Sequence, residues 1–188
     1  MNTSTQGVEL LSGFVFDVLS EYQNVRKVCA PAFEIAAGLD ANRSDQWCSI
    51  DIYNELCTWI EVNVGSSSIR RAGSAIGARV YDNMVAKKMG SSSDPLAMMN
   101  ALKLLATQVI RDPSGRGWEV DQKDSKTIEM RRTQTFNCVL QEGLLLALVE
   151  KTGVLMPSVS HIRCTRRGDD FCDYQVRWLR ERKPPSKL

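Results

Sequence analysis

The residues best suited to chemistry in this chain are its single histidine and two of its six cysteines. They form the pattern His161-x2-Cys164-x7-Cys172 near the C-terminal end. Imidazole and thiolate groups are the ligands that a tetrahedral zinc ion prefers. A β-hairpin that turns within residues 166–170 would place Cys164 near the end of one strand and Cys172 near the start of the next. The two sulfurs could then converge on one ion.

A fourth ligand must come from elsewhere, and Cys138 is best placed because it opens an apolar helix just before the hairpin. Side chains 161 and 164 point to opposite faces of a regular strand, so we expect a bulge or a turn beginning near Cys164. A second interpretation stays open. Free cysteine is among the most buried residue types, and Cys164 and Cys172 could be core residues, with His161 an ordinary strand histidine.

The elements that must position these residues are helices in the first two thirds of the chain and mostly strands after it. Apolar spacing predicts helices around residues 14–22, 24–38, 49–60, 67–88 and 94–110. Short β segments at 118–120 and 127–131, an apolar helix over Cys138–Lys151, and strands near 155–164 and 171–179 should follow. This order predicts an α+β fold, in which an N-terminal helical layer packs on a C-terminal antiparallel sheet with a zinc-tied β-hairpin.

Two glycines four residues apart, Gly73 and Gly77, lie inside one predicted helix. Each costs about 1 kcal/mol relative to alanine there, so we expect them to allow close approach by a neighbouring backbone or a ligand.

Length and composition limit the class of protein. With 188 residues, we expect a single domain over 1–179 and a flexible charged tail at 180–188. The formal charge of +2 is too small to suggest nucleic-acid binding, and no apolar run reaches the length of a membrane helix. An N-terminus without basic residues argues against a signal peptide, and therefore for the cytoplasm. A single histidine and the lack of nucleotide-binding loops favour a protein that is not an enzyme.

The segment from Cys138 to Trp178 carries a family resemblance. It reads Cys138-Val-Leu-Gln-Glu-Gly143, then His161-x2-Cys164, Gly168 and Cys172-Asp-Tyr174. In this it resembles the 4-vinyl reductase domain family, which is similar to the N-terminal sensor domains of aromatic-catabolism regulators. Two further segments resemble that family and the haem nitric-oxide-binding fold more weakly. They are Asp45-Gln-Trp47 and Ala72-Gly73-x3-Gly77.

The resemblance implies a structural zinc. In the sensor relatives the first cysteine, a glutamate and the two later cysteines hold the ion. Here His161 occupies the glutamate position, so the implied ligands are Cys138, His161, Cys164 and Cys172. Four protein ligands leave no open position for water, which makes such an ion structural and not catalytic.

The resemblance also implies a small-molecule-binding sensor or regulatory domain. It would work as a homodimer, signalling through dimer packing or an unknown downstream protein. A small apolar or aromatic ligand would lie between the helical layer and the sheet. Candidate pocket residues are Met84, Met98, Met99 and Trp118, whose alternative role is ordinary core packing.

Three alternatives belong to other functional classes. The first is a haem-binding gas sensor with His161 as axial ligand. The second is a scaffold or adaptor that resembles the vesicle-tethering proteins. The third, a reductase, lacks any visible cofactor-binding motif.

Three pairs of adjacent arginines are most simply solvated surface residues, and a joint role in binding an anionic ligand is the alternative. They are Arg70-Arg71, Arg131-Arg132 and Arg166-Arg167.

Overall fold

The computed structural model describes residues 4–132 and 136–179, so the predicted tail at 180–188 lies outside the described residues. The described chain combines helices with two antiparallel sheets, which confirms the predicted α+β class. Its elements are β1 (Glu9–Leu11), α1 (Gly13–Ser20), η1 (Gln23–Val25), α2 (Ala30–Ile35), β2 (Trp47–Ser49), α3 (Ile50–Asn63), α4 (Ser66–Ala86), α5 (Pro95–Val109), β3 (Ile110–Arg111), β4 (Trp118–Asp124), β5 (Thr127–Arg132), α6 (Cys138–Lys151), β6 (Ser158–Arg163), η2 (Thr165–Arg167) and β7 (Cys172–Arg177).

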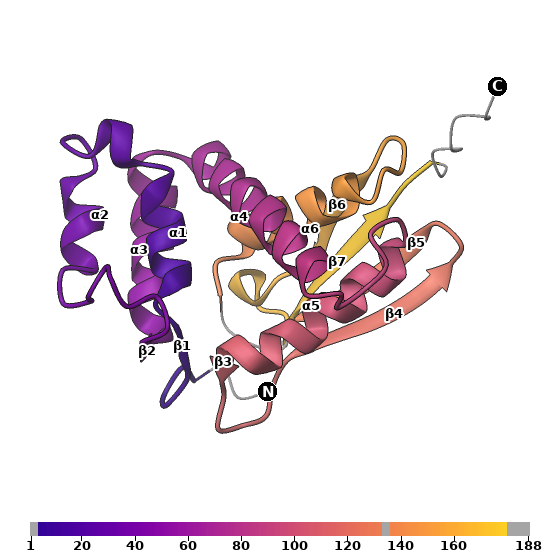
Figure 1. The fold of residues 1–188 in the computed structure, drawn as a ribbon, viewed down its shortest axis with the longest axis horizontal. Helices are drawn as coiled ribbons and strands as arrows, with labels where there is room; N and C mark the ends of the chain where they lie inside the picture. The colour runs from indigo at the N-terminus through magenta and orange to yellow at the C-terminus, as the bar shows by residue number, and fades with distance from the viewer. Residues whose placement is uncertain (1–3, 133–135, 180–188) are drawn as a thin grey trace.

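The elements form an N-terminal helical group and a larger helix-on-sheet body (Figure 1). Helices α1, α2 and α3 stand together at one end, beside a small sheet of order β2-β1-β3. Helices α5 and α6 lie against the four-stranded sheet of order β4-β5-β7-β6, and α4 packs on α6. All neighbouring strands of this sheet are antiparallel. The small sheet was not predicted, because strands of two or three residues are too short to show a period in the sequence.

Capping side chains fix where three of the helices begin. Asp94 accepts hydrogen bonds from the backbone N–H groups of the first turn of α5, Ser49 caps α3, and Asn137 caps α6. Each cap satisfies a backbone donor that would otherwise lack a partner. Helix α6 spans the predicted residues. The helix predicted over 24–38 is shorter, since only a 3-10 turn and the six residues of α2 are helical there.

Helices α4 and α6 pack backbone against backbone through glycines. A Cβ atom on Gly73 would overlap the carbonyl oxygen of Leu140, and one on Gly143 would overlap that of Arg70. On Gly77 a Cβ would lie 2.5 Å from the carbonyl oxygen of Leu144. The expected close approach at Gly73 and Gly77 is therefore made by a neighbouring helix.

The hairpin of β6 and β7 is irregular at one residue. His161 pairs with Tyr174 and Arg163 pairs with Asp173, so Ile162 is an extra residue on β6. A bulge of this kind changes the direction of the following side chains. It resolves the conflict between positions 161 and 164 noted in the sequence.

The described residues contain no helix that is both long and apolar enough to span a bilayer.

Candidate metal centre and ligand pocket

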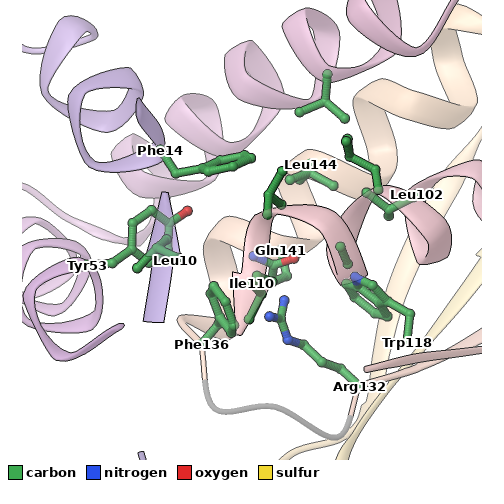
Figure 2. A pocket seen from close by; sticks show the side chains of 14 residues that line it. Leu10, Phe14, Tyr53, Leu102, Ile110, Trp118, Arg132, Phe136, Gln141 and Leu144 are labelled. Carbon is green, nitrogen blue, oxygen red and sulfur yellow. The ribbon is translucent and has the colours of Figure 1, made fainter. Parts of the chain in front are cut away.

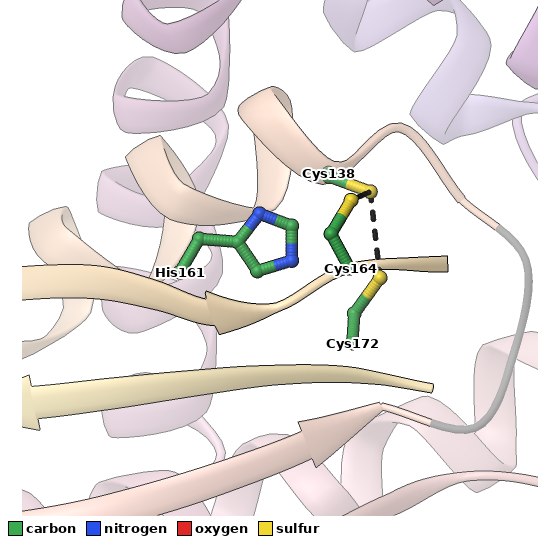
Figure 3. Close-up of side chains that lie close together, drawn as sticks. All are labelled: Cys138, His161, Cys164 and Cys172. Carbon is green, nitrogen blue, oxygen red and sulfur yellow. Dashed lines mark hydrogen bonds between the residues drawn. The ribbon is translucent and has the colours of Figure 1, made fainter. Parts of the chain in front are cut away.

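The four predicted metal ligands meet in one place (Figure 3). Cys138 comes from the first turn of α6, His161 from β6, and Cys164 and Cys172 from the two ends of the hairpin loop. Their ligand atoms all lie within 4.8 Å of one another. The Sγ atom of Cys138 is 3.4 Å from that of Cys172 and 3.7 Å from that of Cys164. A tetrahedral ion with bonds of about 2.3 Å would separate its sulfurs by about 3.8 Å, so the spacing suits such an ion.

His161 presents one ring nitrogen to the sulfurs and the other to a carboxylate. Its Nδ1 lies 3.5 Å from Oε1 of Glu142. Its Nε2 is buried and faces the cysteines in Figure 3, and it meets no hydrogen-bond partner in the described part of the chain. The ring also stacks on Tyr174, with centroids 4.5 Å apart. A histidine whose Nδ1–H donates to a carboxylate has Nε2 free to bind a metal.

The thiols and the imidazole perturb one another strongly. Hydrogen bonding between Cys138 and Cys172 raises the pKa of Cys138 and lowers the pKa of Cys172. Burial opposes protonation of His161, but interactions with Cys172 and Glu142 outweigh it and raise its pKa to about 9. Anionic sulfur is thus favoured within the cluster. A divalent cation would complete the deprotonation, since thiolates and not thiols bind metals.

Glu142 is a supporting residue that the sequence reasoning missed. It lies on α6 four residues after Cys138, on the same face of the helix. Its Oε2 is 2.6 Å from a guanidinium nitrogen of Arg70 on α4. Burial raises the pKa of Glu142, but hydrogen bonds from His161 and Arg70 outweigh it, so the carboxyl group is ionised more readily than usual. The sequence feature that could have identified Glu142 is its position one helical turn after Cys138.

A second network joins the hairpin loop to the N-terminal helices. Arg166 lies in the loop between the two hairpin cysteines. Its two terminal guanidinium nitrogens donate to the Glu61 carboxylate of α3 at 2.9 and 2.8 Å. Asn137, next to Cys138, donates to the same carboxylate at 2.6 Å. The hydrogen bonds from Arg166 and Asn137 lower the pKa of Glu61.

An apolar pocket lies where the N-terminal group meets the larger body (Figure 2). Its empty space, counted together with the part that is open to solvent, is about 480 Å³. Of the predicted pocket residues, Trp118 lines it, whereas Met84, Met98 and Met99 do not and are fully buried in the core. The lining residues are Leu10, Phe14, Tyr53, Val80, Leu102, Leu105, Ala106, Val109, Ile110, Trp118, Arg132, Phe136, Gln141 and Leu144.

Two buried polar side chains interrupt the apolar wall. Arg132, at the end of β5, is 3% exposed, and Gln141 of α6 is 4% exposed. The Arg132 guanidinium lies over the ring of Phe136 at 3.6 Å and over that of Trp118 at 4.9 Å. Burial lowers the pKa of Arg132 to about 10. The guanidinium is thus a charged group within an apolar pocket.

Comparison with known proteins finds similarity at the level of structure. No family model matches the chain, and no curated protein matches it. Among solved structures, a mutant H-NOX domain from Shewanella oneidensis in the Fe(II)CO state has a TM-score of 0.64 and 17% identity, covering 88% of this chain and 97% of its own. An H-NOX protein from S. oneidensis in the Fe(II)NO state gives 0.61 and 16%, with 89% and 98% coverage. An unliganded Fe(II) H-NOX protein from K. algicida gives 0.56 and 9%, with 93% and 98% coverage.

These likenesses show the fold. The chain has the fold of H-NOX domains over nearly its whole described length. This agrees with the weaker of the sequence resemblances, the one to the haem nitric-oxide-binding fold. Membership of the 4-vinyl reductase family stays a prediction, since no family model matches.

Proposed function

We propose that this chain is a small-molecule-binding sensor or regulatory domain whose C-terminal hairpin is held by a structural zinc ion. The observation that carries the proposal is the position of α6. Its first turn supplies Cys138 to the ligand cluster, and its next turn supplies Gln141 and Leu144 to the apolar pocket. A site that binds a ligand and a site that fixes the fold therefore share one helix.

The donor set supports zinc. Three thiolates and one imidazole are a common tetrahedral zinc environment, and the buried Nε2 of His161 lacks any other partner. Cys138, His161, Cys164 and Cys172 would hold the ion and tie the start of α6 to the hairpin. Zinc bound in this way supplies folding energy and has no open position for chemistry. We therefore propose a protein that is not an enzyme.

Assembly and location belong to the proposal as well. A domain that senses a ligand needs an output, and we propose a homodimer that acts through its packing or through a downstream protein. All six cysteines are free thiols, which supports the cytoplasm, where thiols stay reduced. Light scattering of the purified protein tests the dimer.

Haem is the second candidate, favoured by the fold that the chain shares with iron-containing H-NOX structures. The residues of this pocket do not fit haem held through histidine. His161, the only histidine, is not among the pocket residues and faces the cysteines instead. Among the described lining residues, Tyr53 is the one that can ligate iron. Burial raises the pKa of Tyr53 well above the ordinary value, which disfavours the phenolate. The predicted axial role of His161 thus has no support from the geometry.

Metal analysis of the purified protein separates the two candidates. We expect one zinc per chain and no visible absorption band. The Cys164→Ser variant should lose the metal, whereas Cys48→Ser, which replaces a buried thiol outside the cluster, should keep it. Iron with an intense visible band would support haem. Full zinc content in Cys164→Ser would contradict the ligand assignment.

Ligand binding is tested by thermal unfolding against a set of small aromatic and aliphatic compounds. A ligand present at a hundred times its Kd stabilises the folded state by about 2.7 kcal/mol, which raises Tm by about 5–10 °C in a chain of this size. Ala106→Phe should fill the pocket and abolish the shift. Thr107→Phe adds the same ring at an exposed position of α5 and should retain it. Loss of the shift in both variants, or in neither, would contradict binding in this pocket.

A further inference from the structure

The three arginine pairs of the sequence have different environments. Arg70 pairs with Glu142, Arg166 with Glu61, and Arg131 with Glu119 and Asp173. Arg132 follows Ile128 and Met130 on the core-facing side of β5, and all three are buried. Its four strongest electrostatic neighbours are two tyrosines and two cysteines, none of which is a carboxylate.

The Arg132 side chain also leaves a donor unused. Its Nε–H is buried and finds no hydrogen-bond partner among the residues that the structure describes. The rings of Phe136 and Trp118 stabilise the cation through their faces, but a ring face next to the guanidinium does not accept the in-plane Nε–H. A buried donor without an acceptor costs about 1–3 kcal/mol. Such a group inside a pocket is expected where a ligand supplies the acceptor.

We propose that Arg132 anchors the carboxylate of an amphipathic monocarboxylic acid, whose apolar body occupies the pocket lined by Phe14, Tyr53, Leu102 and Leu144. This inference rests on the proposed ligand-binding function and names the class of its ligand. Figure 2 shows Arg132 reaching from the end of β5 toward the Gln141 amide, the second polar group of the wall. A guanidinium presents its donors as a planar fork that matches a carboxylate.

Charge and shape favour this class over other anions. Among the described residues that line the pocket, Arg132 is the one cation and the other side chains are neutral. A dianionic phosphate would leave one charge uncompensated in an apolar site, which is costly. A neutral alcohol would leave the guanidinium without a counter-charge. A single carboxylate on an aromatic or aliphatic body satisfies both the charge and the apolar wall.

A competing role for Arg132 is compensation of the thiolates. Arg132 pairs in register with Cys172 on the neighbouring strand, and three thiolates around a divalent zinc carry one net negative charge. In that case the arginine would serve the metal centre, and the pocket would show no preference for acids. The two roles therefore make opposite predictions for the unmodified protein.

The test compares two probes that differ only at one end, 3-phenylpropionate and 3-phenylpropan-1-ol, by isothermal titration calorimetry of the metal-loaded full chain. A charge-assisted hydrogen bond is worth roughly ten- to one-hundred-fold in affinity, so the acid should bind at least about ten times more tightly than the alcohol. Arg132→Gln should remove this preference by lowering the affinity for the acid to about that for the alcohol. Arg132→Lys, which keeps the charge and loses the fork, should retain part of it.

The matched control is Arg111→Gln. Arg111 follows the pocket residue Ile110 but stacks on Trp47 and is exposed. The Arg111→Gln substitution removes the same charge near the pocket without altering the pocket wall, so the preference for the acid should persist.

Three results overturn the proposal. The first is equal binding of acid and alcohol by the unmodified protein. If Arg132→Gln also lost its metal, the role of Arg132 would be to compensate the charge of the thiolates. In that result the alcohol still binds, and the proposed ligand-binding function survives. The second is an undiminished acid preference in Arg132→Gln. If neither probe binds the unmodified protein, both the carboxylate anchor and the pocket function fail for this ligand class. Should Arg132→Gln not fold, the unmodified protein and Arg132→Lys decide the question.

Discussion

Replacing Glu142 by glutamine should weaken zinc binding although the residue does not touch the metal. The carboxylate accepts from Nδ1 of His161 at 3.5 Å and is itself held by Arg70 at 2.6 Å. These contacts set the tautomer and the orientation that present Nε2 to the cluster. Outer carboxylates of this kind contribute about ten- to one-hundred-fold in metal affinity, which corresponds to about 1.4–2.7 kcal/mol. We expect Glu142→Gln to fall within this range, because the amide can accept from Nδ1 but carries no charge.

The assay is competition for zinc with a chromophoric chelator at fixed pH. Glu150→Gln is the matched control, since it makes the same substitution at an exposed position of the same helix. Arg70→Gln should give a smaller loss than Glu142→Gln, because it removes the group that holds the carboxylate and not the carboxylate itself. Zinc affinity of Glu142→Gln equal to that of Glu150→Gln would refute the supporting role of this carboxylate.

Three further predictions concern stability. Hydrogen bonds from Arg166 lower the pKa of Glu61. The stability that Glu61 contributes is therefore present above the ordinary glutamate pKa and is lost as the pH falls through the lowered value. Glu61→Gln should cost about 1 kcal/mol at neutral pH, and its difference from the unmodified protein in chemical denaturation should shrink below about pH 4. Gly143→Ala should lower the free energy of unfolding by about 1–3 kcal/mol, because the added Cβ forces α4 and α6 apart. Gly38→Ala, where a Cβ meets nothing within 4 Å, should be nearly neutral. Equal melting temperatures of these two variants would contradict the close packing of the helices. Chelation of the metal should lower the Tm of the unmodified protein and leave that of Cys164→Ser unchanged, and an equal response of both in calorimetry would contradict a structural ion.

The parts of the fold that were predicted correctly are those with a local cause. Asp94 and Pro95 mark the start of α5, and a continuous apolar stretch marks α6. The bulge at Ile162 was expected near its position because His161 and Cys164 could not otherwise face the same ion. Each of these features follows from neighbours within a few residues, which a single sequence contains.

The parts that were missed depend on residues far apart in the chain. Helix α6 brings Glu142 to His161, but only the packing of α6 on β6 determines which carboxylate is close enough. The pocket collects side chains from segments between Leu10 and Leu144, whereas the three methionines expected there have the spacing of core residues and are core. Asp173 lies between Cys172 and Tyr174 in the sequence, in an alternation that is typical of a solvent-facing position, yet it is buried between Arg131 and Arg163.

The glycine contacts between α4 and α6 make these two helices one mechanical unit. Val80 on α4 and Leu144 on α6 both touch the pocket, while Cys138 and Glu142 on the same α6 serve the ligand cluster. Because the backbones touch where Gly73 and Gly143 lie, neither helix can slide without displacing the other. A ligand that displaces the pocket wall would therefore move α4 and α6 together, while a metal bound by the cluster would hold the first turn of α6 in place.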